Sequence, residues 1–146
     1  MTFYRHFRSK SDLVVAYIEQ QSAAERAWME GARTPGDPVG TLRRLATDIG
    51  EASCRPGFRG CAFINAAAEF PDAGDPVRVA VEEHRAWMLD LFAAVAADAG
   101  VDVVAATARQ LQILRDGAMV NGCLGDPATV AGSLADAFTA IVRPAE

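Results

Sequence analysis

The sequence predicts an all-helical protein built around a single buried core, and three observations support this. Hydrophobic residues make up 51% of 146 residues, which is enough for one domain with a sizeable interior. Alanine is very frequent, and there are no runs of Val, Ile and Thr bounded by regularly spaced turns, as a β protein would have. Apolar residues instead recur three and four positions apart, between segments marked by Gly, Pro and Asp.

Capping residues mark the starts of four helices. Asp followed by Pro occurs at positions 37–38, 75–76 and 126–127. In each pair the Asp side chain can accept hydrogen bonds from the free N–H groups of the first turn, where Pro has no N–H to lose. Ser9, with Asp12 three residues later, is a form of the capping box. These starts predict helices over 10–30, 38–53, 76–99 and 127–142, and apolar spacing adds two more, over 61–70 and 103–123.

Each predicted helix has an apolar face that should point toward the core. The apolar face of the predicted helix 10–30 consists of Leu13, Tyr17, Ala24 and Trp28, and Val14 and Ile18 widen it. That of 38–53 consists of Val39, Leu42, Leu45 and Ile49. The clearest face, over 76–99, consists of Val77, Val81, His84, Met88, Leu91 and Val95. Gly100 is expected to end this helix. In the last helix, small Ala131 and Ala135 lie beside the apolar stripe and would let another helix approach closely.

The charge pattern excludes two classes of protein. A net charge of −5 does not suit a protein that coats nucleic acid over its whole surface, because phosphate binding needs clustered Lys and Arg. The first ten residues nevertheless contain Arg5, Arg8 and Lys10 and no acid, so a small basic tip precedes an acidic body. Aspartates interrupt the most apolar stretch, 89–108, and no apolar run reaches the roughly 18–20 residues of a membrane span.

The cysteines and histidines predict neither an enzyme nor a metal site. Cys54, Cys61 and Cys123 cannot all pair, and no signal-peptide pattern opens the sequence, so reduced thiols in the cytoplasm are expected. None of these residues falls into a nucleophile or metal-ligand spacing, and no cofactor is expected. A thiol redox sensor remains an alternative, because Arg55 and Arg59 flank the first two cysteines.

The segment TFYRHFRSKSDL, residues 2–13, resembles the junction in TetR-family (TetR/AcrR) transcriptional regulators between the recognition helix of a helix-turn-helix and the long connecting helix. The matching positions are Thr2, Phe3, Tyr4, His6, Phe7, Ser9, Lys10, Asp12 and Leu13. The segments GCAFINAAAEFPD and ILRDGA also resemble a subset of the family. The resemblance implies a TetR-like C-terminal helical bundle preceded by the tail of the recognition helix.

This resemblance implies a division of the chain and a function. Residues 1–9 would be the remnant of the helix-turn-helix domain, and residues 10–146 a ligand-binding and dimerisation domain, with 10–30 as the connecting helix. The family pattern has two and a half helices before Thr2, so we expect a chain truncated within the helix-turn-helix. The implied function is transcriptional regulation, by repression as is usual in the family. An effector-binding and dimerising module without DNA binding is the alternative.

The resemblance also implies roles for single residues. In the complete protein, Tyr4 and Lys10 would contact phosphates of operator DNA, with Thr2 and His6 nearby. A small-molecule effector would enter a pocket among the middle helices, although core packing is the alternative role for each candidate. The candidates are Phe63, Asn65, Phe70, His84, Trp87, Met88, Phe92 and Met119. His84 and Asn65 are polar groups that need a partner, which a ligand could supply.

The final two predicted helices resemble the surface through which the family forms homodimers. Two helices from each subunit make a four-helix bundle there, and two-fold symmetry then places two helix-turn-helix domains on the operator. The residues expected at this interface are Leu111, Leu114, Val130, Leu134, Phe138 and Ile141.

Overall fold

The computed structural model describes residues 7–143, and this part of the chain contains helices and no strand. The helices are α1 (Lys10–Ala32), α2 (Pro38–Ser53), α3 (Ala62–Glu69), α4 (Pro76–Asp98), α5 (Val104–Leu124), the 3-10 turn η2 (Pro127–Thr129) and α6 (Val130–Val142). The prediction of an all-α protein is confirmed, and the predicted helix boundaries lie within a few residues of the observed ones. No helix of the described range is long and apolar enough to cross a membrane.

The three Asp-Pro starts work as the sequence predicts. Asp37 accepts a hydrogen bond from Gly40 N at 2.9 Å, and Asp75 accepts one from Val77 N at 2.8 Å. Asp126 caps in the same way, but it opens η2 and not an α-helix. The last helix therefore begins with one tighter turn, which the prediction of a continuous helix from 127 missed.

The start of α1 is a variant of the predicted capping box. Ser9 Oγ accepts from Asp12 N at 3.0 Å, and Asp12 Oδ2 accepts from Arg8 N at 3.1 Å. The carboxylate thus reaches one residue further back than the capping residue itself. These two bonds tie the residues just before α1 to its first turn.

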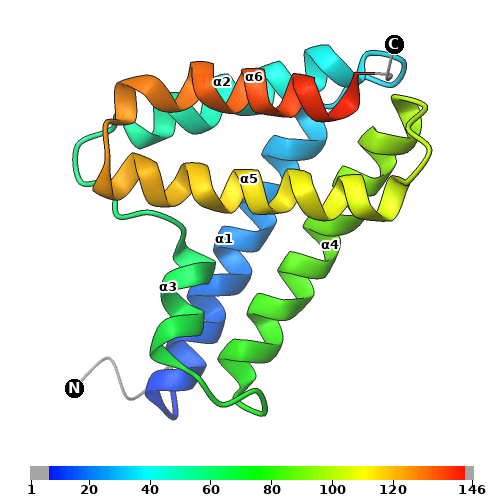
Figure 1. Ribbon diagram of the computed structural model, residues 1–146. Helices are drawn as coiled ribbons and strands as arrows, with labels where there is room; N and C mark the ends of the chain where they lie inside the picture. Colours follow the sequence, from blue (N-terminus) through cyan, green and yellow to red (C-terminus); the bar gives the residue numbers. More distant parts are fainter. Residues whose placement is uncertain (1–6, 144–146) are drawn as a thin grey trace.

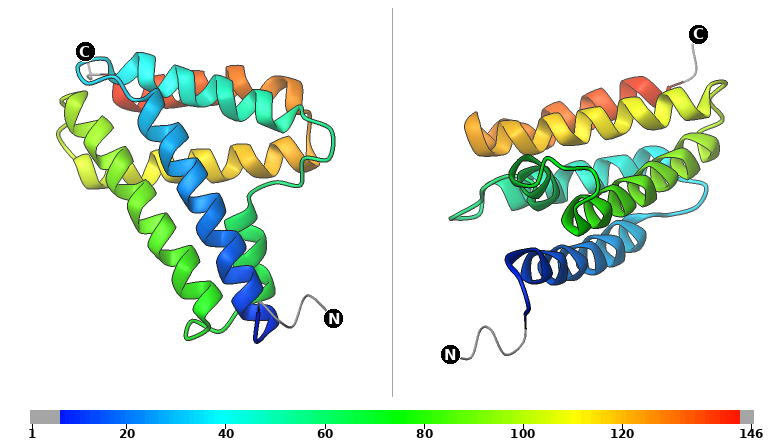
Figure 2. Two further views of the ribbon diagram at one scale, coloured as in Figure 1. Left: turned by 180° about the vertical axis from the view of Figure 1, so that it is seen from behind. Right: turned by 90° about the horizontal axis from the view of Figure 1, so that it is seen from below.

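The helices form two groups that meet at the core (Figure 1). α2, α5 and α6 lie beside one another at one end, with α2 and α6 packed along their length. α1 and α4 run side by side away from that group, and α3 lies next to the start of α1 at the far end, as the view from behind also shows (Figure 2). The first turns of α1 and α4 and the end of α3 are therefore neighbours.

Two apolar clusters hold these groups together. The larger cluster joins α2, α4, α5 and α6 with the end of α1, which contributes Met29. In it the rings of Phe92 and Phe138 meet edge to face with centroids 5.9 Å apart. The smaller cluster joins α1, α3 and α4 through Ile18, Phe63 and Val81. All six residues of the stripe predicted for α4 are buried, as are Leu42, Leu45 and Ile49 of α2.

The close approach predicted for the last helix occurs between α6 and α2. A Cβ atom added to Gly50 of α2 would lie 2.5 Å from the Cβ of Ala131, a distance that real atoms do not share. Glycine at this position therefore permits the two helices to touch.

The stripe predicted for the first helix is wrong at its centre. Tyr17 is 48% exposed and Ala24 is also exposed, whereas Ile18 and Met29 are the buried residues of α1. The buried line passes through Ser22 and Glu25, so polar residues on it hid the stripe from a pattern based on apolar spacing.

Candidate functional site

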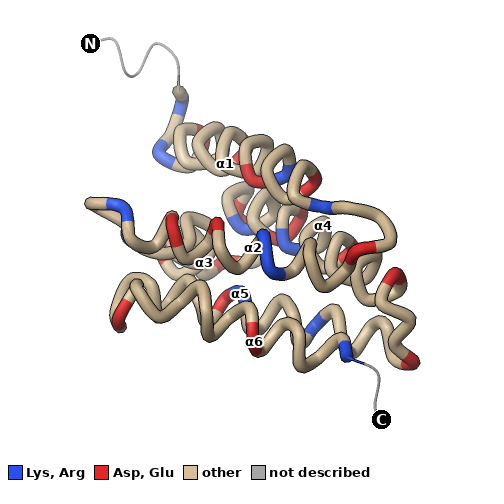
Figure 3. The backbone as a smooth tube through the Cα atoms, turned by 90° about the horizontal axis from the view of Figure 1, so that it is seen from above, with Lys and Arg blue, Asp and Glu red and all other residues tan. Residues whose placement is uncertain are grey.

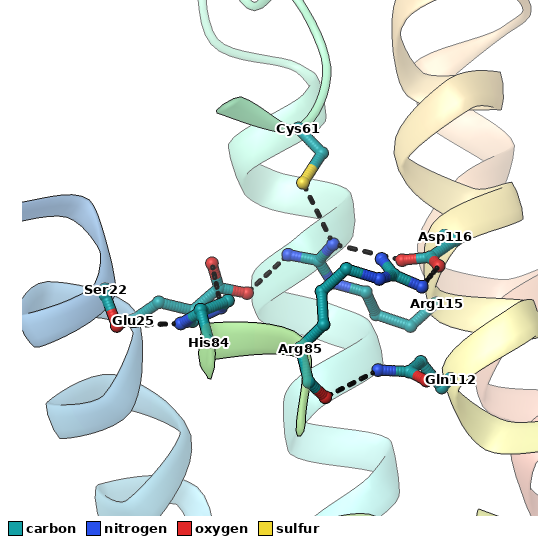
Figure 4. Close-up of polar contacts among 8 residues, drawn as sticks. All are labelled: Ser22, Glu25, Cys61, His84, Arg85, Gln112, Arg115 and Asp116. Atoms are coloured by element: carbon teal, nitrogen blue, oxygen red, sulfur yellow. Dashed lines mark hydrogen bonds and ion pairs between the residues drawn. The ribbon is translucent and has the colours of Figure 1, made fainter. Parts of the chain in front are cut away.

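A chain of charged side chains crosses the interior where α1, α4 and α5 meet (Figure 4). Arg115 of α5, with a side chain only 3% exposed, forms an ion pair with Glu25 of α1. The same guanidinium contacts Asp116 at 3.3 Å, and Asp116 in turn pairs with Arg85 of α4 at 2.7 Å. Two acids and two bases alternate along this chain, so the charges balance within it.

Both members of the central pair are held in their charged forms. Burial alone would raise the pKa of Glu25, but the contact with His84 and the charge of Arg115 together lower it below its ordinary value. Burial likewise acts to lower the pKa of Arg115, and the neighbouring Glu25 more than offsets this and raises it. The site therefore keeps a carboxylate and a guanidinium in contact inside the protein.

His84 of α4 extends this network toward α1. It is fully buried, its Nδ1 lies 2.9 Å from Ser22 Oγ, and its Nε2 lies 3.5 Å from a Glu25 oxygen. Because Ser22 Oγ already accepts from Arg26 Nε at 3.1 Å, its own proton is free to bond Nδ1, which favours a ring proton on Nε2 facing Glu25. Phe63 stacks on the ring with centroids 3.7 Å apart, so the imidazole has little room to move.

Beside this network lies a cavity of about 470 Å³ between α1, α2 and α5. One face of each helix lines it: Gln21, Ala24, Glu25 and Trp28 of α1, Asp48, Ile49, Glu51 and Ala52 of α2 with Arg55 just beyond, and Arg115 and Met119 of α5. We call it the α1–α2–α5 cavity. Trp28 Nε1 donates to Asp48 Oδ2 at 2.6 Å and so links two of its walls.

One polar atom of Arg115 has no partner. Its Nε is buried and finds no hydrogen-bond acceptor among the residues that the structure describes. The other two nitrogens of the guanidinium are engaged, Nη2 with Glu25 and Nη1 with Asp116 and the Cys61 sulfur, the latter at 3.2 Å. A buried N–H without an acceptor is costly, so the ion pairs of the two other nitrogens have to offset it.

The structure brings together some of the predicted pocket residues and separates others. Phe63 stacks on His84, and Trp87 meets His84 at a tilt, with its ring centroid 5.5 Å from that of His84. Met88 and Phe92 lie in the larger apolar cluster. Met119 alone among the predicted residues lines the α1–α2–α5 cavity.

The other two predicted pocket residues lie nearer the surface. Asn65 is exposed, and its side chain donates to the Arg59 carbonyl at 3.0 Å. Phe70 lies 5.6 Å from the ammonium of Lys10. The partner expected for His84 comes from the protein itself, as Ser22 and Glu25.

Sequence reasoning missed the residues that define this cavity, in particular Glu25, Asp48 and Arg115. A usable signal existed for two of them. Glu25 lies on the line of Ile18 and Met29, and Arg115 lies four residues after Leu111 on the buried line of α5. A charged residue on an otherwise buried helical line needs a buried partner of opposite charge.

Four of the six residues expected at a dimer surface are buried within this chain. Leu111, Val130, Leu134 and Phe138 are each at most 4% exposed and belong to the larger apolar cluster, although Val130 and Leu134 also line a groove between α5 and α6. Their role in a dimer stays a prediction. Leu114 and Ile141 are partly buried. The apolar side chains that α5 does expose are Ile113 (68%), Val120 (45%) and Leu124 (82%). The apolar stripe of α6, which suggested a dimer surface, packs against α2 of the same chain.

Thr2, Tyr4 and His6, the predicted phosphate contacts, lie outside the described residues. Lys10, the fourth, is the first residue of α1, with a side chain 70% exposed and its Nζ 3.4 Å from Glu69 Oε1. Figure 3 shows basic positions at this end of α1, next to the N-terminal segment. Lys10 is therefore accessible where the resemblance expects a DNA contact.

The cysteines occupy different environments. Cys54 and Cys123 are exposed, and Cys61 is buried against Arg115. No group of three or more His, Cys, Asp or Glu side chains that could hold a metal ion occurs within residues 7–143.

The fold and the sequence together identify the class of protein. A solved TetR-family transcriptional regulator from Streptomyces coelicolor superposes with a TM-score of 0.89 and 42% identity, covering 97% of this chain and 75% of that one. A TetR transcriptional regulator from Streptomyces avermitilis has the same fold, with a TM-score of 0.77 and 24% identity, over 96% of this chain and 79% of that one. No protein-family model and no curated protein matches the chain.

These likenesses define an all-helical transcriptional regulator. The chain belongs to the TetR family, as residues 2–13 indicated, and its all-α fold is TetR-like.

Proposed function

We propose that the chain acts as a cytoplasmic TetR-family repressor, without catalytic activity, whose helical body binds a small-molecule effector and forms a homodimer. Residues 10–146 form this body, and residues 1–9 belong to the DNA-contacting part. The observation that carries the proposal is the α1–α2–α5 cavity of about 470 Å³, a volume typical of small-molecule sites.

The position of the cavity supports a link between effector and DNA. Its wall includes Glu25 and Trp28 of α1, the helix whose first turn belongs to the segment resembling the helix-turn-helix junction. A ligand that presses on α1 would alter the orientation of the residues attached to its first turn. Regulation then requires the effector to bind one orientation of α1 more tightly than the other.

At the other end of α1, Thr2, Tyr4, His6 and Lys10 would contact operator phosphates. In this structure Lys10 pairs with Glu69 while both side chains are more than 60% exposed. An exposed pair of this kind is worth at most about 1 kcal/mol, so a phosphate can readily replace the carboxylate.

The homodimer would form through the exposed side of α5 and α6. A groove between these helices is lined by Ile113 and Gly117 of α5 and by Ser133 and Ala137 of α6, among others. Gly117, Ser133 and Ala137 are small and permit close helix approach. Ile113, Val120 and Leu124 form an exposed apolar row along α5. A two-fold axis here would pair the same face of two copies.

A gel-shift assay with the DNA upstream of the gene tests the proposal. The chain is compared with a version extended in frame at its N-terminus, each with and without compounds that raise its melting temperature. We expect the extended version to bind the DNA and a stabilising compound to release it. Equal binding by both versions, or binding that no stabilising compound alters, would contradict the proposal, and absence of binding by both would favour the module without DNA binding.

A further inference from the structure

We propose that the ligand of the α1–α2–α5 cavity is an organic cation with an apolar body. This inference rests on the proposed effector site and specifies the chemistry of its occupant. It is argued from the charges, the aromatic ring and the apolar residues that line the cavity.

The charges at the cavity wall leave an excess of carboxylate. Glu25, Asp48 and Glu51 contribute acids, and Arg55 and Arg115 contribute bases. The positive charge of Arg115 is already matched by Glu25 and Asp116. What remains is two carboxylates of α2 against the exposed Arg55, which has no ion-pair partner in the described part of the chain. A positively charged group would balance the negative charge of this wall, whereas an anion would add to it.

Trp28 supplies a second feature that suits a cation. Its Nε1 donates to Asp48, so the indole and the carboxylate are held next to each other at the cavity wall. A cationic group there can contact the carboxylate oxygen that Trp28 does not use together with the aromatic face. The other tryptophan, Trp87, already has the guanidinium of Arg26 at 4.9 Å from its ring, whereas within the described range no cation lies over Trp28.

The remaining wall is apolar and accommodates the body of such a ligand. Ala24, Ile49, Ala52 and Met119 line it. The flexible thioether of Met119 can adapt to an aromatic ring or an alkyl chain. The pocket therefore offers contacts for an apolar body in addition to those for the charge.

Three probes of similar size separate these features. Benzoyl-ethylenediamine carries an aryl ring, a carbonyl and an ammonium; hippurate replaces the ammonium by a carboxylate; phenylbutylamine keeps the ammonium and lacks the carbonyl. Binding to the full chain is measured by ligand-observed NMR at millimolar concentrations. We expect both ammonium probes, benzoyl-ethylenediamine and phenylbutylamine, to bind about tenfold more tightly than hippurate, because the charge and not the carbonyl decides binding.

Two variants connect binding to the cavity. Asp48→Asn keeps an oxygen that can accept from Trp28 but removes the charge, and it should weaken benzoyl-ethylenediamine about tenfold while sparing hippurate. Asp102→Asn, an exposed residue in the turn before α5, is the matched control and should leave binding unchanged. Ala52→Trp fills the cavity and should abolish binding of every probe that uses it.

The outcomes distinguish this inference from the proposed function. If hippurate binds as well as the cationic probes and Ala52→Trp abolishes its binding, the cation is refuted and the effector cavity stands. If binding survives Ala52→Trp, the cavity itself is wrong. If no probe binds the unaltered chain, the inference is also refuted.

Discussion

Glu25 of α1 and Arg115 of α5 are 90 positions apart in the chain and form a buried ion pair. The pair joins α1 to a helix of the other group. It also forms part of the wall of the α1–α2–α5 cavity, so the proposed effector would lie directly against it. The first two predictions test what these two side chains contribute to the fold.

Replacing Arg115 by Ala should destabilise the fold by about 3–5 kcal/mol, because Glu25 would remain buried without its counter-charge, whereas Asp116 keeps Arg85. Urea unfolding followed by circular dichroism measures this free energy. Arg109→Ala, an exposed position on the same helix, is the control and should change it by less than about 0.5 kcal/mol. Equal effects of the two substitutions would show that the pair does not stabilise the fold.

The stability that Glu25 contributes should depend on pH in a defined direction. Its pKa is lower in the folded state than the ordinary value of 4.5, so the contribution is complete above that value and is lost as pH falls through the folded pKa. The unfolding free energy of Glu25→Gln should therefore lie below that of the unaltered chain at neutral pH and approach it in acid. Glu30→Gln, exposed on the same helix, should show no such convergence. A difference that stays constant into acid would contradict the lowered pKa.

Gly50→Ala should separate α2 from α6. The added Cβ would lie 2.5 Å from that of Ala131 and 2.9 Å from backbone atoms, which cannot give way easily. We expect a loss of about 1–3 kcal/mol in thermal or urea unfolding, typical of overpacking. Gly31→Ala meets nothing within 4 Å and should be neutral or stabilising. The reverse order of the two variants would mean that the two helices do not touch at Gly50.

Val120→Glu should convert the proposed homodimer into monomers. Val120 of α5 is 45% exposed on the proposed interface, and a charge buried between two subunits without a partner would be costly. Val79→Glu on α4, where the residue is 44% exposed, is the matched control and should leave the dimer intact. Sedimentation velocity distinguishes the two states, and a dimer that survives Val120→Glu would place the interface elsewhere.

Alkylation of the native chain should reach Cys54 and Cys123 well before Cys61. The first two are exposed, while the sulfur of Cys61 is buried against Arg115. Mass spectrometry of peptides at increasing reaction times measures the order. Reversible oxidation of Cys61 by peroxide in the folded chain would instead favour the alternative of a thiol sensor.

The sequence by itself determined what depends on neighbours in the chain. The Asp-Pro starts, the cap at Ser9 and the stop at Gly100 are interactions over a few residues, so each could be predicted before any packing was known. The α4 stripe was equally clear because nearly all its members are apolar. Residues 2–13 were also sufficient to indicate the TetR family.

Only the tertiary structure decided how the helices face one another. The α1 stripe is interrupted by Ser22 and Glu25, whose partners His84 and Arg115 come from helices far along the chain. The sequence showed the apolar stripe of α6 but not which partner it faces, and the structure assigns that stripe to α2. The physical reason is that helix formation follows local hydrogen bonding and spacing, whereas a buried charge pair or a cavity exists only after separate helices meet.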